Sequence, residues 1–261
     1  MVARVVLTRP APRQVALKQA LEAAGIEVLA LPALEIVALD TVGRLPDPCE
    51  FDVAIFVSRT AWQTYWQALR AQDPCFVWPM TCQLASVGAS TAQAIKQDLK
   101  QVALEGETFV LTPDADTTQD SESLWHQLRQ ALRPGARVLL VRGAAGRDWL
   151  AQTLQAQGFV THIHETYRRE PAQWSASAID TLRQWQASGS LGTWLITSAQ
   201  GLSAIQAQWR VHAMGAVRPE GAVVVHPRLQ ALVGLWLPPL SSVRVAQPED
   251  QSLFIALTQQ R

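Results

Sequence analysis

The segment 160–171, VTHIHETYRREP, contains Tyr167, one of only two tyrosines in a chain of 261 residues. A phenol keeps its proton at neutral pH, so it can donate a hydrogen bond or the proton itself to a reacting group. Charged residues follow it directly, and Pro171 closes the run. The alternative is a tyrosine that only packs, which is the interpretation we favour for Tyr65 in its helical tryptophan stripe. The position of Tyr167 at a strand end makes it the first candidate for chemistry.

Polar residues also stand at four predicted strand-to-helix turns. They are Thr8 with Arg9, Ser58 with Arg59, Gly88 with Ser90 and Thr91, and Ser198. A helix start presents unpaired N–H groups and partial positive charge, so it can bind a carboxylate or phosphate. The alternative is ordinary N-capping, and Ser90 with Gln93 predicts a capping box. Because the four turns arise from related units and should face the same way, we expect them to bind an anion.

The turn VRGAAGRD, residues 141–148, carries Arg142 and Arg147, two guanidinium groups suited to carboxylate pairing. Solvated surface charge is the competing interpretation. The turn also suggests a dinucleotide site, but it lacks the full GxGxxG pattern and the acidic residue expected on the next strand. His162 and His164 alternate along one strand, yet no Cys or carboxylate group joins them in sequence, so we expect no metal site.

Composition excludes several classes of protein. The 22 basic and 22 acidic residues give zero net charge, which argues against a general nucleic-acid binder. Three cysteines without CxxC spacing favour reduced thiols in a cytoplasmic protein. No apolar run is long enough to cross a membrane or to form a signal-peptide core. No GxSxG, Cys–His or paired-carboxylate pattern provides for hydrolase chemistry.

Short apolar segments alternate with helical periodicity along the whole chain. The predicted strands cover 4–8, 27–34, 51–58, 83–88, 137–141, 159–167, 193–197, 221–225 and 243–246. Between them, apolar residues recur at helical spacing, as Trp62, Trp66 and Leu69 do. This alternation predicts an α/β fold with parallel sheets of the flavodoxin or Rossmann type.

Several segments repeat at offsets of about 130 to 140 residues. VVLTRP matches VLLVRG, AIFVSRTAW matches TWLITSAQG, SVGASTAQAI matches VVVHPRLQAL, and SESLWHQL matches DQSLFIAL. Each half has the size of one small domain, so the sequence predicts two similar α/β domains. Paired domains of this kind form a cleft at the carboxyl ends of their strands, where ligands commonly bind.

Taken together, VLTRP, IFVSRTAW, SVGASTAQAI, LLVRGAAGRDWLAQTLQAQGF, ETYRRE and LITSAQGL make the chain resemble the uroporphyrinogen-III synthase family. Each motif is loose, but the ordered set covers essentially the whole chain. The resemblance implies one discontinuous domain, 1–36 plus 172–261, and an inserted domain, 38–170. The chain would cross between them near 32–40 and 166–173 through a two-stranded connection. Tyr167 would then lie beside the cleft.

The resemblance also implies the reaction. The family closes the linear tetrapyrrole hydroxymethylbilane, with loss of water and inversion of the last pyrrole ring, and uses no metal or organic cofactor. Tyr167 matches the family's tyrosine that assists departure of the hydroxyl. The substrate carries many carboxylates, which the helix starts, Arg142, Arg147 and other arginines would bind. The family further suggests a cytoplasmic monomer in tetrapyrrole and heme biosynthesis, with transient contact to the preceding pathway enzyme.

One turn departs from the family pattern. Where the family has a turn like Gly-Pro-Thr-Thr, this chain has HPRL, residues 226–229. Either Arg228 binds a substrate carboxylate directly, or that half of the site is weakened. Two alternatives therefore stay open: a two-lobed anion- or tetrapyrrole-binding protein of the same fold without activity, and a nucleotide-dependent enzyme for which RGAAGR is the one supporting segment.

Overall fold

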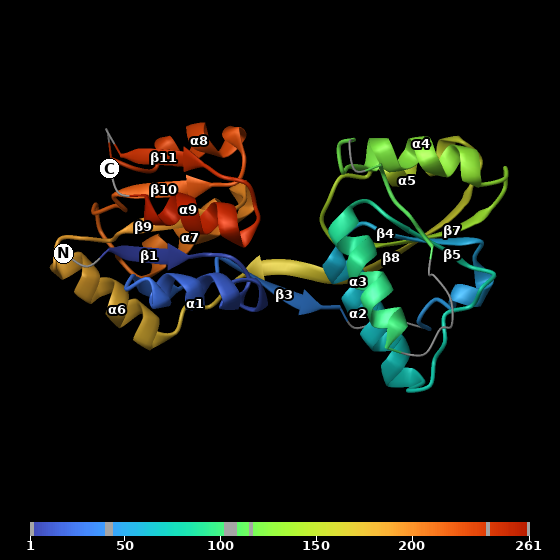
Figure 1. Ribbon diagram of the computed structural model, residues 1–261, viewed down its shortest axis with the longest axis horizontal. Coiled ribbons are helices and arrows are strands. Elements are labelled where there is room, and N and C mark those ends of the chain that lie inside the picture. The colour runs from blue at the N-terminus through green and yellow to red at the C-terminus, as the bar shows by residue number, and fades with distance from the viewer. Residues whose placement is uncertain (1–2, 40–43, 102–108, 115–116, 239–240, 260–261) are drawn as a thin grey trace. The chain divides into compact units, whose positions relative to one another are not determined.

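The computed structural model describes residues 3–39, 44–101, 109–114, 117–238 and 241–259. These residues form two compact units, Met1–Ile36 with Glu170–Arg261 as unit 1, and Val37–Arg169 as unit 2. The chain passes between the units along β3 (Leu34–Ala38) and β8 (Val160–Pro171), which are neighbours in the sheet of unit 2 (Figure 1). The first crossing expected from the sequence ends on Asp40, which lies outside the described residues.

Unit 1 contains a five-stranded parallel sheet in the spatial order β2–β1–β9–β10–β11. Its strands are β1 (Arg4–Leu7), β2 (Glu27–Ala30), β9 (Thr193–Ile196), β10 (Gly221–Val224) and β11 (Ser242–Val245). The central strands are apolar on both faces because helices cover both sides, as parallel sheets require.

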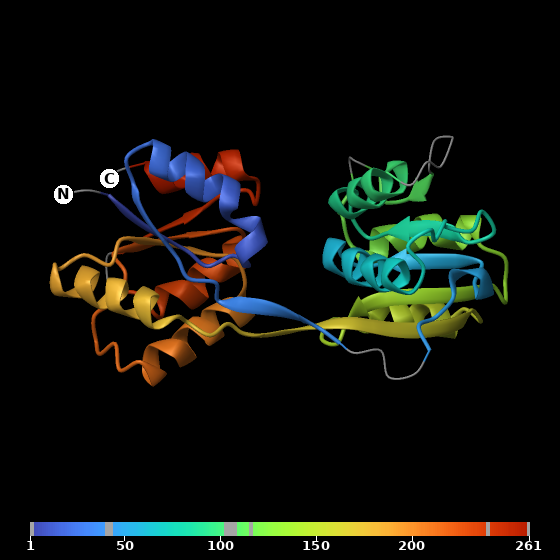
Figure 2. The ribbon, with the colours of Figure 1, turned by 90° about the horizontal axis from the view of Figure 1, so that it is seen from below.

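The helices of unit 1 lie in two layers with the sheet between them (Figure 2). They are η1 (Ala11–Arg13), α1 (Val15–Ala23), α6 (Ala176–Ala187), α7 (Ala199–Val211), α8 (Pro227–Gly234) and α9 (Asp250–Thr258). Leu17 of α1 and Leu253 of α9 pack with Val5 on one face. Leu182 of α6 and Ile205 of α7 pack with the tryptophans of unit 1 on the other face. Both faces of this sheet are therefore core.

Unit 2 contains a six-stranded sheet in the order β3–β8–β7–β4–β5–β6. Besides β3 and β8, its strands are β4 (Val53–Phe56), β5 (Gln83–Ser86), β6 (Val110–Leu111) and β7 (Arg137–Gly143). The pairs β7–β8, β7–β4, β4–β5 and β5–β6 are parallel. The carboxyl ends of these strands therefore share one edge of the sheet.

Helices cover both faces of this sheet as well. They are η2 (Pro48–Glu50), α2 (Arg59–Gln72), α3 (Ala89–Lys100), α4 (Ser121–Ala131) and α5 (Trp149–Ala156). Leu124 and Leu154 of α4 and α5 pack on one face. On α2, Trp62 makes an edge contact with Phe56 at 5.0 Å and stacks on Trp66 at 5.2 Å. The tryptophan stripe predicted from helical spacing is core.

The two sheets have the same spatial order once the repeats are matched. β1 and β7, β9 and β4, and β10 and β5 begin matching segments, and they occupy matching places in their sheets. The expected α/β fold of two similar parallel-sheet units is thus confirmed. The sequence prediction was wrong in detail at 27–34, which forms β2 and then turns, because Pro32 cannot donate a ladder hydrogen bond. It also missed the two-residue strand β6.

Candidate functional site

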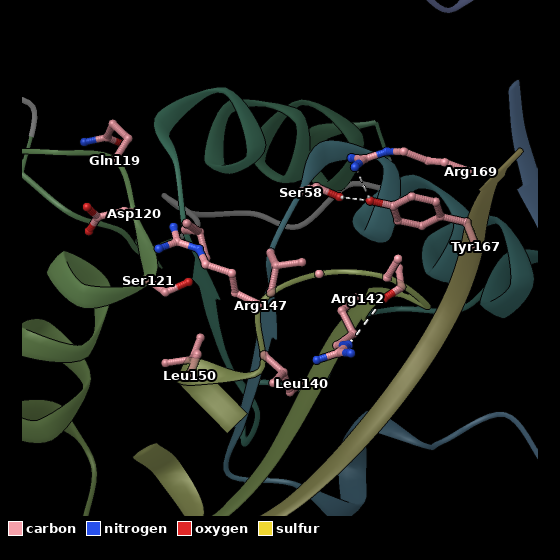
Figure 3. A pocket seen from close by; sticks show the side chains of 15 residues that line it. Ser58, Gln119, Asp120, Ser121, Leu140, Arg142, Arg147, Leu150, Tyr167 and Arg169 are labelled. Atoms are coloured by element: carbon pink, nitrogen blue, oxygen red, sulfur yellow. Dashed lines mark hydrogen bonds between the residues drawn. The ribbon is translucent and has the colours of Figure 1, made fainter. Parts of the chain in front are cut away.

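A pocket of about 260 Å³ lies at the carboxyl edge of the sheet in unit 2, where β4 and β7 are neighbours. From β4 the chain builds the sheet outward through β5 and β6, and then returns to place β7 on the other side of β4. Such a reversal point is where open α/β sheets commonly bind ligands. Its polar lining includes Ser58, Gln119, Asp120, Arg147, Tyr167 and Arg169 (Figure 3).

A shift in strand register places Tyr167 in this pocket. Arg142 pairs with Glu165, but the next residue, Gly143, pairs with Tyr167, so β8 contains one extra residue, Thr166. The strict alternation of a strand is broken there, and Thr166 and Tyr167 are both buried, at 5% and 4% exposure. Gly143 is required opposite the ring, because a Cβ at that position would lie 2.8 Å from Cζ of Tyr167.

Two side chains contact the hydroxyl of Tyr167. Ser58 Oγ lies 3.1 Å from Oη, and Arg169 Nη2 donates to Oη at 3.4 Å. The guanidinium of Arg169 also lies 5.7 Å from the centre of the phenol ring. Ser58 is itself held as the N-cap of α2, where its Oγ accepts from Ala61 N–H at 3.1 Å. The phenol is thus fixed between a helix start and a cation.

The two arginines predicted from the VRGAAGRD turn are placed differently. Arg142 is largely buried and pairs with Asp148 at 2.5 Å and Glu165 at 3.4 Å, so a ligand carboxylate would have to displace one of them. Arg147 is exposed and pairs with Glu122 at 3.3 Å, an arrangement of small energy that a ligand can replace. Asp148 also precedes α5 as its N-cap residue, and its negative charge disfavours phosphate at that helix start.

The predicted anion site at the start of α3 is closed by a distant side chain. The capping box at Ser90 was wrong: the helix begins at Ala89, with Gly88 as its N-cap residue. Gln119 Oε1 accepts from the Ala89 N–H at 2.8 Å, while its Nε2 donates to carbonyl oxygens in its own loop. Ser90 is exposed and Thr91 is buried. An amide oxygen therefore occupies the place expected for a substrate carboxylate.

A fixed negative charge also lines the pocket. Asp120 is the N-cap of α4, where Oδ1 accepts from Ser123 N–H at 2.8 Å. That hydrogen bond, with a smaller contribution from Arg147, holds the pKa of the Asp120 carboxyl below its usual value despite some desolvation. The pocket thus presents Asp120 on one side and the Tyr167–Arg169 pair on the other (Figure 3).

The predicted residues of unit 1 follow β1, β9 and β10 in a separate sheet. The hydroxyl of Thr8 is buried and donates to Leu195 O, and Arg9 pairs with Asp250 at 2.5 Å. Ser198 caps α7 by accepting from Gly201 N–H at 3.0 Å. In the HPRL turn, His226 Nδ1 accepts from the backbone N–H of Arg228 at 3.1 Å, and the Arg228 side chain is exposed. Of the predicted site residues, the pocket in unit 2 brings together Ser58, Arg142, Arg147 and Tyr167.

The lining residues that sequence reasoning missed include Gly143, Gln119, Asp120 and Arg169. The spacing of Arg169, two residues beyond Tyr167, was a usable signal, because residues i and i+2 of a strand share a face. Gln119 had no local signal, since its partner on α3 is 30 residues away.

Neither histidine of β8 belongs to a metal site in the described part of the chain, where no group of three or more potential ligands converges. His162 contacts the ring of Phe51, and the buried His164 contacts the ring of Tyr65 at 5.6 Å. Among the same residues, no helix combines the length and apolar character needed to cross a membrane.

Comparison with known proteins gives the same family throughout. The model of the family described as uroporphyrinogen-III synthase HemD matches residues 15–227. A uroporphyrinogen-III synthase of Proteus mirabilis is 30% identical over 170 residues, covering 63% of this chain and 79% of the relative. One from Salmonella typhimurium is 27% identical over 212 residues, covering 78% and 80%. The crystal structure of the Helicobacter pylori uroporphyrinogen-III synthetase shares the fold, with a TM-score of 0.57, 15% identity and coverage of 98% and 99%. Since the family model spans most of the sequence, the chain belongs to the uroporphyrinogen-III synthase family.

Proposed function

We propose that this chain closes hydroxymethylbilane to uroporphyrinogen III, with loss of water and inversion of the last pyrrole ring. Membership of the family supports the reaction. The observation that carries the proposal to named residues is the buried phenol of Tyr167, held by Ser58 and Arg169 in a pocket at the carboxyl edge of a parallel sheet.

In this proposal Tyr167 assists departure of the terminal hydroxyl. The phenol donates its proton to the hydroxyl oxygen, the carbon–oxygen bond breaks, and water leaves. The electrophilic carbon that remains is attacked by the α-carbon of the last pyrrole ring that already carries the methylene bridge. The bond from that α-carbon to the bridge then breaks, and the bridge carbon bonds to the opposite α-carbon of the ring, which gives up its proton; this exchange of bonds inverts the ring. That proton returns to the phenolate, so the enzyme ends unchanged. No electron is transferred, and the balance requires no cofactor.

The pocket accounts for binding of part of the substrate. Its volume of about 260 Å³ lies slightly below the roughly 300–1,000 Å³ of pockets that enclose a whole ligand, so we assign it to one end of the bilane. Arg147, which lines the pocket and is exposed, supplies positive charge for a carboxylate of that end. Holding the chain ends together is the larger contribution of the protein, because fixed proximity removes the entropy cost of ring closure.

The test is to supply the purified protein with enzymatically generated hydroxymethylbilane and to identify the porphyrinogen isomer. We expect uroporphyrinogen III. Tyr167→Phe should lower turnover by about a hundredfold, the lower end of general-acid effects, with an unchanged melting temperature. The non-catalytic alternative predicts only the spontaneous isomer. An unchanged rate and isomer ratio in the variant would remove Tyr167 from the mechanism.

We further propose a cytoplasmic location and a transient contact with the enzyme that supplies the bilane. The contact is supported by the reactivity of the bilane, which closes without a catalyst into the wrong isomer if it waits in solution. Competition by a catalytically dead copy of this protein during coupled turnover tests it, because a docking contact makes the dead copy raise the fraction of the spontaneous isomer.

A further inference from the structure

We propose that Arg169 is a positioning residue that acts through Tyr167. Arg169 and Ser58 together supply two hydrogen-bond donors to the phenolate oxygen, which is formed when Tyr167 has given its proton to the leaving water. This inference rests on the proposed function and adds a residue to it. It assigns Ser58 to the support of the phenol, in place of the substrate contact expected from the sequence.

Two side-chain atoms, Arg169 Nη2 and Ser58 Oγ, lie within hydrogen-bonding distance of Tyr167 Oη and support this role. Arg169 Nη2 donates to Oη at 3.4 Å, and its guanidinium lies 5.7 Å from the ring centre, so the cation is close to the whole phenol. Ser58 Oγ lies 3.1 Å from Oη and accepts from Ala61 N–H, which leaves its own O–H to donate to Oη. A phenolate would therefore receive one charged and one neutral hydrogen bond without any rearrangement.

The charges around the pocket make Arg169 the cation best placed for this task. Arg142 is paired with Asp148 and Glu165, and Arg147 with Glu122. Among the described residues, Arg169 has no carboxylate partner, and its contact is with the phenol. A cation that is not neutralised by an acid can stabilise the negative charge that develops on Oη when the proton leaves.

The alternative role is direct binding of a substrate carboxylate, without action through Tyr167. The two roles predict different kinetics. Stabilisation of the phenolate matters only while the proton is transferred, so its loss lowers kcat. A carboxylate contact made equally in the bound substrate and the transition state raises KM and leaves kcat unchanged.

The experiment is a double-mutant cycle of Arg169→Gln and Tyr167→Phe, measured as kcat and KM with bilane as substrate. Arg169→Gln alone should lower kcat between about tenfold and a hundredfold, the effect of one hydrogen bond to a charged group. In the Tyr167→Phe background it should lower kcat less than about twofold, because the group it supports is gone. Arg169→Lys should retain part of kcat, because lysine keeps the positive charge but lacks the planar guanidinium group with its several N–H donors.

The matched control is Arg168→Gln, which removes the same charge from the neighbouring, exposed position outside the pocket lining and should leave kcat unchanged. Melting temperatures of all variants separate these effects from unfolding. Multiplicative losses in the cycle, or a change confined to KM, would overturn the inference while leaving the proposed function intact. Failure of the unmodified protein to make uroporphyrinogen III would instead overturn the proposed function.

Discussion

Gly143→Ala tests whether the position of the Tyr167 ring controls catalysis. The backbone of Gly143 has no left-handed conformation, so alanine fits it without backbone strain. The added Cβ, however, would lie 2.8, 3.0 and 3.2 Å from Cζ, Cε2 and Cε1 of the ring. Because carbon atoms in contact are about 3.5 Å or more apart, the ring must retreat by roughly 0.7 Å.

That displacement is large compared with the contacts it disturbs. A retreat of roughly 0.7 Å along the bond would carry the Ser58–Tyr167 pair beyond the hydrogen-bonding range of about 3.5 Å. Overpacking of this kind costs about 1–3 kcal/mol of unfolding free energy, so the protein should still fold. A misplacement near 1 Å can cost about a hundredfold in rate, and we expect kcat to fall between tenfold and a hundredfold.

The assay combines kcat with bilane, the isomer ratio of the product and the melting temperature. Gly146→Ala is the matched control, because it adds the same methyl group to the same turn, where nothing lies within 4 Å. Gly146 also lines the pocket, so the control separates movement of the ring from filling of the pocket. Full activity of Gly143→Ala, or an equal loss in both variants, would refute control by the ring position.

Two further predictions concern stability. Burial, and to a lesser extent His162, lower the pKa of His164, so the unfolded chain binds this proton first as pH falls. The unfolding free energy should therefore decrease as the pH falls below about 6.5, and this decrease should be less steep in His164→Gln. Parallel pH profiles of the variant and the unmodified protein, measured by urea denaturation, would contradict this prediction. Gln119→Ala should lower the unfolding free energy by about 0.5–2 kcal/mol, because it removes the side-chain acceptor that caps α3; an unchanged unfolding free energy, measured by urea denaturation, would contradict the cap.

Much of the fold follows from local pattern. Apolar runs such as 53–56 and 193–196 must be buried on both faces, and the helical spacing of Trp62 and Trp66 fixes one face of α2. Their alternation with helices and the repeated segments predict two similar parallel sheets. Ser58 and Ser198 were also predictable as helix caps, because a cap is a contact with residues only three positions away.

The failures occur where contacts join distant segments. Ser90 had the local signal of a cap, but Gln119 reaches α3 from another loop and the helix begins earlier. Arg142 has the residue type for a substrate carboxylate, yet the register of β7 against β8 places Glu165 beside it. The sequence pattern around Ser90 does not reveal Gln119, and the pattern around Arg142 does not reveal Glu165.

The sequence by itself determined the α/β class, the repeated units, the family resemblance and the candidacy of Tyr167. The tertiary structure alone decided which groups meet the phenol. An extra residue in β8 turns Tyr167 towards Gly143, and Ser58 comes from a turn 109 residues away. The physical reason is that periodicity records whether a residue is buried, whereas the register between distant strands decides what it is buried against.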